Sequence, residues 1–314
     1  MSVLILLKTI IIYSLPAITL IGLITNSMSL IIFSRKRFRG TIFSTYFRIY
    51  LVIEITKLIF PINKMFELNL GMYFHLISDF CCKLRRFFSN CNFAITSSFL
   101  VVISIDRYLS IAYPTKFLFR KKGLFQLIIS FFIIGVNCCI YIPFSLYFLK
   151  EIRKNVTNQT VVISYECASV ISLIKFINLF QEFAIPFILM FLFSSLTIKT
   201  VFNSRRSSSN NSSVVKSKDL KFAVSSISIN ILFLVFNSPY FILFVLHDNL
   251  NLFVNMSDLV KFLDALSFFL YYISSCLSLF TNYFSNSLFR KEFQNLFFCR
   301  SNKNVLNSRN ETKS

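Results

Sequence analysis

Long apolar stretches alternate with short polar ones along almost the whole chain. A membrane-spanning helix needs about 20 mostly apolar residues, and seven segments reach or approach that length. They are residues 9–34, 49–63, 82–111, 123–149, 176–200, 222–246 and 265–289. The pattern therefore predicts an all-α membrane protein built as a bundle of seven transmembrane helices.

A shorter segment with a different pattern follows the seventh apolar stretch. Phe289, Phe293, Leu296 and Phe297 recur at helical spacing, with charged residues between them, which is typical of an amphipathic helix in the membrane interface. Cys299 near its end is either a palmitoylation site or an ordinary buried thiol. We expect a short extracellular N-terminus (1–8), the bundle (9–286), an interfacial helix (287–300) and a flexible cytoplasmic tail (301–314).

Basic residues are distributed unevenly over the predicted loops. The segments after spans one, three, five and seven hold about twice as many Lys and Arg residues as the others, and basic loops stay on the cytoplasmic side. This predicts a multi-pass protein of the plasma membrane with an extracellular N-terminus and a cytoplasmic C-terminus. The sequons at Asn155 and Asn158 then lie outside and can carry glycans. Residues 204–217, rich in Ser and Asn, are predicted to form a flexible inner loop.

Composition excludes several classes of protein. With 55% hydrophobic and 15% charged residues, the chain is too apolar for a soluble domain. The net charge of +20 would suit nucleic acid, but the aromatic residues lie inside the apolar runs, so we expect membrane lipids and no nucleic acid as partners. Two His residues and scattered Cys residues predict no metal site and no catalytic centre. No inverted repeat indicates a transporter or channel, which remains a less favoured alternative.

Charged residues inside the predicted spans require a partner or a role, since each costs about 2.5–3.5 kcal/mol at a helix centre. Asp106 and Arg107 lie at the inner end of the third span and can pair with each other. Arg107 can also reach an acid on another helix, and Asp219 at the start of the sixth span is a candidate. Such a contact would act as a latch between helices. Alternatively, Arg107 extends to the lipid headgroups.

Several motifs together resemble the rhodopsin-like (class A) G protein-coupled receptors. Residues 104–114, which include Asp106-Arg107-Tyr108, follow that family's inner end of helix three, and Cys82 precedes Arg107 by the family's spacing. The resemblance covers roughly residues 16–299 and implies a disulfide between Cys82 and Cys167. It also implies an activation switch that comprises Asp106, Arg107, Tyr108, Asp219, Phe233, Asn237 and Pro239.

The chain departs from this family in its activation machinery. Ser278 to Asn282 stand where the family has Asn-Pro-x-x-Tyr, Asn237 replaces a tryptophan, and Ser194 replaces a tyrosine. The expected proline kink and tyrosine of helix seven are therefore missing. A degenerate receptor that folds but no longer couples is the alternative to an active one.

Glu54 in the second span resembles the acid that binds a sodium ion in this family. The resemblance implies a polar core of Asn26, Glu54, Thr96, Ser274 and Ser278. Two other readings of Glu54 are open: it can be protonated and hydrogen-bonded, or Lys57, one turn further along the helix, can neutralise it.

The chemical class of the ligand is limited mainly by the absence of two residues that other receptors of this family use to bind theirs. Ser89 stands where amine receptors have an Asp, and Tyr272 where opsins have a Lys, which disfavours both classes. Arg85 and Arg86 either meet an anionic ligand group or extend to the membrane edge. Further polar candidates for ligand contacts are Glu182 and Asp264. The resemblance implies a receptor that binds an extracellular peptide or small molecule and activates a heterotrimeric G protein.

Overall fold

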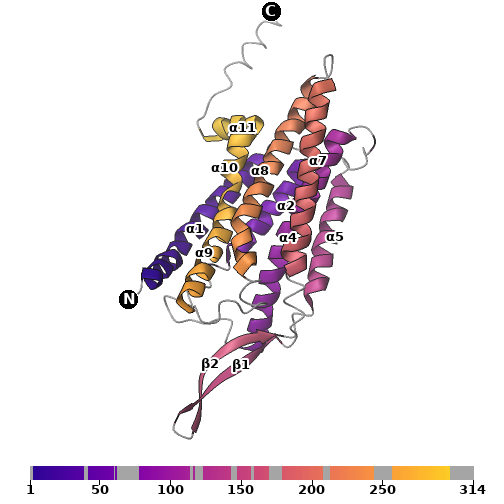
Figure 1. Cartoon of the computed structure of the whole chain (residues 1–314). Helices are drawn as coiled ribbons and strands as arrows, with labels where there is room; N and C mark the ends of the chain where they lie inside the picture. The colour runs from indigo at the N-terminus through magenta and orange to yellow at the C-terminus, as the bar shows by residue number, and fades with distance from the viewer. Residues whose placement is uncertain are drawn as a thin grey trace, which may run out of the picture.

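The computed structural model describes residues 3–38, 42–59, 61, 78–113, 116, 123–142, 147–156, 159–169, 179–207, 213–243 and 257–297. Its helices form an elongated bundle in which successive helices run in opposite directions (Figure 1). The seven predicted spans correspond to α1 (Val3–Phe33), α2 (Ile42–Lys57), α4 (Asp79–Ala112), α5 (Gly123–Tyr141), η4 with α7 (Leu179–Ala184 and Ile185–Ser207), α8 (Ser213–Leu243), and α9 with α10 (Ser257–Cys276 and Ser278–Ser285). The seven-helix prediction is confirmed.

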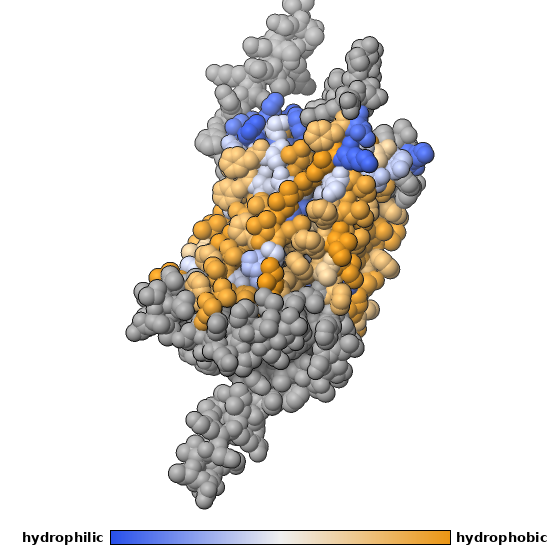
Figure 2. Space-filling view, viewed as in Figure 1, coloured by the Kyte–Doolittle hydropathy of each residue, from blue (hydrophilic) through white to orange (hydrophobic). Residues whose placement is uncertain are grey.

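The surface of the bundle suits a lipid environment. Among the described residues, five helices are long and apolar enough to cross a membrane, and α9 with α10 makes a sixth. Figure 2 shows a broad apolar belt, with polar residues gathered at the α11 end of the bundle. Leu124, Phe131 and Phe132 on α5 turn most of their surface outward, as lipid-facing side chains do. The chain is a multi-pass membrane protein.

Several predicted boundaries were wrong. The second helix begins at Ile42 rather than near residue 49, and the third runs from Asp79 to Ala112. Residues 204–207 and 213–217 of the predicted flexible loop are helical, because α7 continues to Ser207 and α8 begins at Ser213. The prediction inferred a loop from the polar composition of this segment. Ser residues, however, do not prevent a helix from extending beyond its apolar part.

A β-hairpin was not predicted at all. The fourth helix ends at Tyr141 instead of continuing to residue 149, and β1 (Tyr147–Val156) pairs antiparallel with β2 (Gln159–Ser169). The hairpin projects from the end of the bundle at which α1 begins (Figure 1). Asn155 pairs with Thr160 near the tip, whereas Asn158 lies outside the described residues.

The predicted amphipathic helix is present as α11 (Ser287–Phe297), at the opposite end from the hairpin (Figure 1). The Asn286 Oδ1 accepts hydrogen bonds from the backbone N–H groups of Leu288 and Phe289, which caps its first turn. Phe289 is buried with its ring centroid 5.2 Å from that of Phe33 on α1. Cys299 lies outside the described residues.

Candidate functional site

A stripe of buried residues follows the whole length of α4. Cys82, Phe93, Thr96 and Arg107 are all buried along this 34-residue helix, and their spacing matches a single helical stripe. The Ser78 side chain caps the first turn by accepting a hydrogen bond from the Cys81 N–H. The stripe therefore connects the hairpin end of the bundle to the α11 end.

Arg107 is enclosed near the α11 end. Its guanidinium forms an ion pair with Asp106 on the same helix, as predicted from the sequence. The Cζ atom also lies 5.3 Å from the ring centroid of Phe43 on α2 and 5.8 Å from that of Phe222 on α8, within the range of a cation–π contact. The link between α4 and α8 thus includes an aromatic ring, which the sequence did not suggest.

The aromatic group around Arg107 is extensive. The Phe222 ring packs on Phe43 at a centroid distance of 5.0 Å and on Phe38 at 6.1 Å. Phe33 contacts Phe43 and also Phe289 of α11. We call Phe33, Phe38, Phe43, Phe222 and Phe289 the aromatic clamp. It joins α1, α2, α8 and α11, and two of its rings, Phe43 and Phe222, contact the Arg107 guanidinium.

The other predicted switch residues lie on α4 and α8. Asp219 is on α8, but its side chain lies outside the described part of the chain. Asn237 is buried and donates a hydrogen bond to the Phe233 carbonyl. Tyr108 packs its ring near those of Tyr113 and Phe193. Pro239 lies within α8, so these residues occupy the expected helices.

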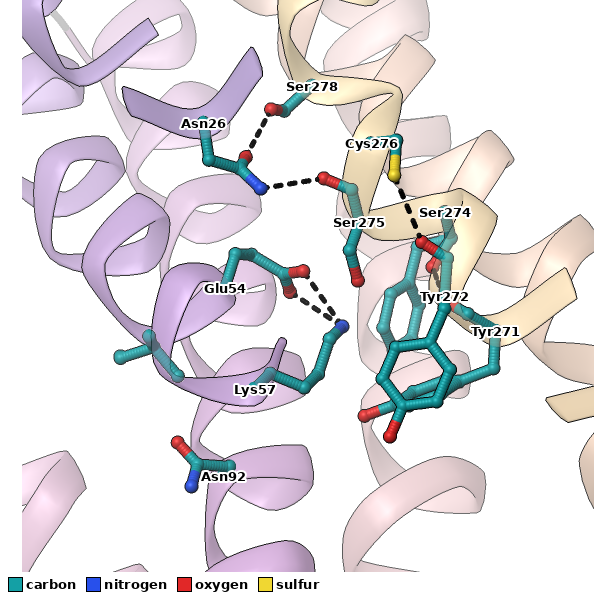
Figure 3. A network of polar contacts seen from close by, with 12 residues as sticks. Asn26, Glu54, Lys57, Asn92, Tyr271, Tyr272, Ser274, Ser275, Cys276 and Ser278 are labelled. Carbon is teal, nitrogen blue, oxygen red and sulfur yellow. Dashed lines mark hydrogen bonds and ion pairs between the residues drawn. The ribbon is translucent and has the colours of Figure 1, made fainter. Parts of the chain in front are cut away.

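A polar cluster joins α1 to α9 and α10. The buried Asn26 donates to the Ser275 carbonyl at 2.9 Å, and the Ser278 hydroxyl donates to the Asn26 Oδ1 at 2.7 Å. Figure 3 shows both contacts beside Glu54 and Lys57. Asn26 and Ser278 were predicted to lie together, and they do.

These contacts lie where the last span bends. The axes of Ala265–Cys276 and Ser278–Ser285 differ by 48°, although no proline is present. A continuous helix would use the Ser275 carbonyl internally, whereas here it accepts from Asn26. The expected loss of the kink was therefore wrong, because a side chain of α1 stabilises the bend.

Further contacts between helices involve Asn230, Ser104 and Ser225, to which no role was assigned from the sequence. Asn230 of α8 donates to the hydroxyls of Ser104 on α4 and Ser194 on α7, at 2.7 and 3.0 Å. The Ser225 hydroxyl of α8 donates to the Asn282 Oδ1 of α10. Asn230 was detectable as a polar residue inside an apolar run, because an amide in the membrane needs hydrogen-bond partners.

Glu54 and Lys57 form an ion pair within α2. Their side chains are only 1% and 2% exposed, and the Lys57 Nζ lies 2.9 Å from Glu54 Oε1 and 2.8 Å from Oε2. Figure 3 shows this ion pair beside the side chains of α9. The Nζ also lies 4.5 Å from the ring centroid of Tyr271 on α9. Of the three readings of Glu54, the structure shows neutralisation by Lys57.

The residues around Glu54 do not fit a sodium ion. The Ser274 hydroxyl donates to the Tyr271 carbonyl and the Ser278 hydroxyl to Asn26. The Thr96 Oγ1 is buried and has no hydrogen-bond partner among the described residues. Among the described residues none of these three hydroxyls is hydrogen-bonded to Glu54, whereas the Lys57 ammonium contacts both of its carboxylate oxygens.

The two arginines near the hairpin end differ in their surroundings. Arg85 lies on the buried stripe of α4 and is partly buried, whereas Arg86 is exposed. The ring of Tyr272 on α9 packs against Phe268 and Tyr271. Only Arg85 therefore faces the interior. Ser89 is partly buried on the same stripe.

Glu182 lies in the π-helical turn η4 and is buried. It accepts a hydrogen bond from the Tyr141 hydroxyl at 3.0 Å, and the neighbouring Gln181 donates to Asn137 of α5. These contacts tie the fifth span to the fourth, so Glu182 has a structural partner. The side chain of Asp264 lies outside the described residues.

Cys82 is buried and forms a disulfide, while five other cysteines are free thiols. Cys167 lies on β2, opposite Leu149 of β1, and β1 packs against α4. The Cys167 side chain is not among those that the structure describes. Cys167 therefore stays the predicted partner of Cys82.

Comparisons with known proteins agree with this architecture. A family model described as a seven-transmembrane receptor of the rhodopsin family matches residues 25–278. Free fatty acid receptor 3 of Mus musculus is 30% identical over 126 residues, which cover 38% of this chain and 39% of that receptor. G-protein coupled receptor 65 of Homo sapiens is 41% identical over 49 residues, 16% of this chain and 14% of that protein. The chain thus spans well under half the length of these relatives.

Proposed function

This chain belongs to the rhodopsin family of seven-transmembrane receptors, and from that membership we propose that it binds an extracellular ligand and activates a heterotrimeric G protein. The hairpin end of the bundle would face outward at the plasma membrane and the α11 end would face the cytoplasm. The excess of basic residues in the loops of the α11 end supports this orientation, and these residues would also attract acidic lipid headgroups.

The enclosure of Arg107 is the observation that carries the proposal. Its ion pair with Asp106 and its contacts with Phe43 and Phe222 hold α2, α4 and α8 together at the proposed cytoplasmic end. A ligand that favours separation of these helices would shift a pre-existing equilibrium. Arg107 would then leave the aromatic clamp and contact the G protein.

Nucleotide exchange tests this proposal. The full chain is expressed with a panel of G proteins and a broad ligand library, and guanine-nucleotide exchange is compared between wild type and Arg107→Ala. We expect exchange in the wild type and a loss of at least about tenfold in the variant, a difference of about 1.4 kcal/mol. Arg290→Ala on the exposed face of α11 is the matched control and should keep exchange.

A degenerate receptor is the second candidate, motivated by the loss of Asn-Pro-x-x-Tyr. Three observations favour an active one: the 48° bend is present, Ser278 bonds to Asn26, and Asn282 joins α10 to α8 through Ser225. Exchange at background level for wild type and Arg107→Ala alike, with normal surface expression, would establish the degenerate reading.

We place an anionic group of the ligand at Arg85. Its partly buried position on the interior stripe of α4 suits a ligand with a carboxylate, whose charge the guanidinium would pair with. The name of the mouse relative, a free fatty acid receptor, points to the same chemistry. A peptide with a free C-terminus is the other form of such a ligand.

A pair of variants tests this placement. Arg85→Gln should weaken the response to carboxylate ligands by about 1.5–3 kcal/mol, the value of a hydrogen bond to a charged group. Arg86→Gln is the matched control, because that side chain is exposed, and it should leave the concentration for half-maximal response unchanged. Equal effects of both variants would contradict the placement.

A further inference from the structure

The anion in the polar core has its counter-ion on its own helix. Glu54 is almost completely buried, and a carboxylate in a membrane-embedded core must be protonated or compensated. Lys57 follows at i+3, which places both side chains on one helix face. Its ammonium contacts both carboxylate oxygens, so the pair carries no net charge toward the rest of the core.

A second set of contacts keeps the ammonium in place. An ammonium has three donors; the carboxylate faces it on one side and the Tyr271 ring on another, at 4.5 Å. Tyr271 in turn stacks on Phe93 of α4 with a centroid distance of 5.0 Å and an interplanar angle of 9°. Lys57 therefore contacts groups of α2 and α9, and Tyr271 connects this contact to α4.

A tethered cation has an advantage over a free one. A dissolved ion loses translational freedom when it binds, whereas the Lys57 ammonium is already attached one turn from its partner. The Ser274 hydroxyl donates to the Tyr271 carbonyl and the Ser278 hydroxyl to Asn26, so the hydrogen bond that each donates goes to a partner other than Glu54. A free cation would have to displace Lys57 from a position where the side chain is 2% exposed.

We infer that Lys57 is a built-in replacement for a metal ion, and that the polar core of this protein is independent of sodium. The inference concerns the folded bundle and requires neither a ligand nor a G protein. Its failure would therefore be distinguishable from a failure of the proposed function.

Thermal unfolding of the purified full chain tests the inference. The midpoint is followed by circular dichroism in sodium chloride and in choline chloride at equal ionic strength. We expect the wild type to unfold at the same temperature in both salts. Lys57→Met, which keeps a long unbranched side chain, one atom shorter, but removes its charge, should unfold at a lower temperature in choline. Sodium should then raise the midpoint of this variant in a saturable manner.

Two control variants separate charge from packing. Lys57→Arg keeps the charge and should show no response to sodium. Glu54→Gln combined with Lys57→Met removes both charges, and it should recover stability in choline and lose the response to sodium. If the single variant cannot be purified but the double variant can, the need of Glu54 for a cation is supported. If neither can be purified, the comparison of salts on the wild type decides alone.

Two results would overturn the inference. The first is a higher unfolding midpoint of the wild type in sodium than in choline, because it would mean that sodium binds despite Lys57. The second is a Lys57→Met variant that is as stable as wild type in choline, because Glu54 would then not depend on the ammonium.

Discussion

Two buried ion pairs, Glu54–Lys57 and Asp106–Arg107, differ mainly in their position along the bundle. In each pair both partners belong to the same helix, so the ion pair by itself joins no helices. In each, the cation also faces an aromatic ring of another helix, and this contact supplies the link. In both pairs, therefore, an acid of the same helix neutralises the cation, and the contact of the cation with an aromatic ring connects that helix to another one.

Their surroundings separate a structural role from a switching role. Arg107 lies near the end of α4, where a long side chain can reach water or headgroups after leaving its rings. The Lys57 side chain is only 2% exposed and lies beside Tyr271 of α9, so it cannot reach water or headgroups in the same way. We therefore expect the Arg107 pair to open during signalling and the Lys57 pair to remain closed.

Removal of the acid from each ion pair should show the largest difference in unfolding free energy between the two pairs. Glu54→Gln leaves the Lys57 ammonium buried without a counter-ion and should cost about 3–5 kcal/mol of unfolding free energy. Asp106→Asn should cost less, because Arg107 can extend toward the headgroups. Denaturation by an anionic detergent in mixed micelles measures both losses. A loss for Asp106→Asn as large as that for Glu54→Gln would contradict the different roles.

The ring that faces Arg107 should influence both stability and signalling. Phe222→Leu removes two aromatic contacts and a cation–π contact, which together amount to about 2 kcal/mol. We expect it to raise ligand-independent nucleotide exchange, because α8 is then held less firmly. Phe222→Tyr keeps the ring and is the control. Unchanged basal exchange in Phe222→Leu would show that the aromatic clamp does not restrain the switch.

The smallest effect is expected where α8 meets α10. Ser225 and Asn282 share one buried hydrogen bond, worth about 1 kcal/mol. A double-mutant cycle with Ser225→Ala and Asn282→Ala should measure a coupling energy of that size. Additive effects on unfolding would mean that the bond contributes nothing to the position of α10.

Different parts of the candidate site were predictable to different degrees. The pairing of Asp106 with Arg107 and of Glu54 with Lys57 follows from sequence distance, because neighbours and residues at i+3 share a helix. The contact between Ser278 and Asn26 required the resemblance to a family. The Phe222 ring beside Arg107 was not predictable, because 41 Phe residues offer no local signal of which ring meets which charge.

The amino-acid sequence alone determined the seven apolar spans, the amphipathic helix after them and the identity of the charges that had to be buried. These properties depend on the free-energy cost of placing polar groups in lipid. That cost depends on each residue and its neighbours along the helix, so it can be read from the sequence. The tertiary structure decided that Lys57 rather than an ion compensates Glu54. It also decided that the last span bends without proline and that aromatic rings enclose Arg107. These outcomes depend on atoms brought together from distant helices, where packing selects one set of partners among many.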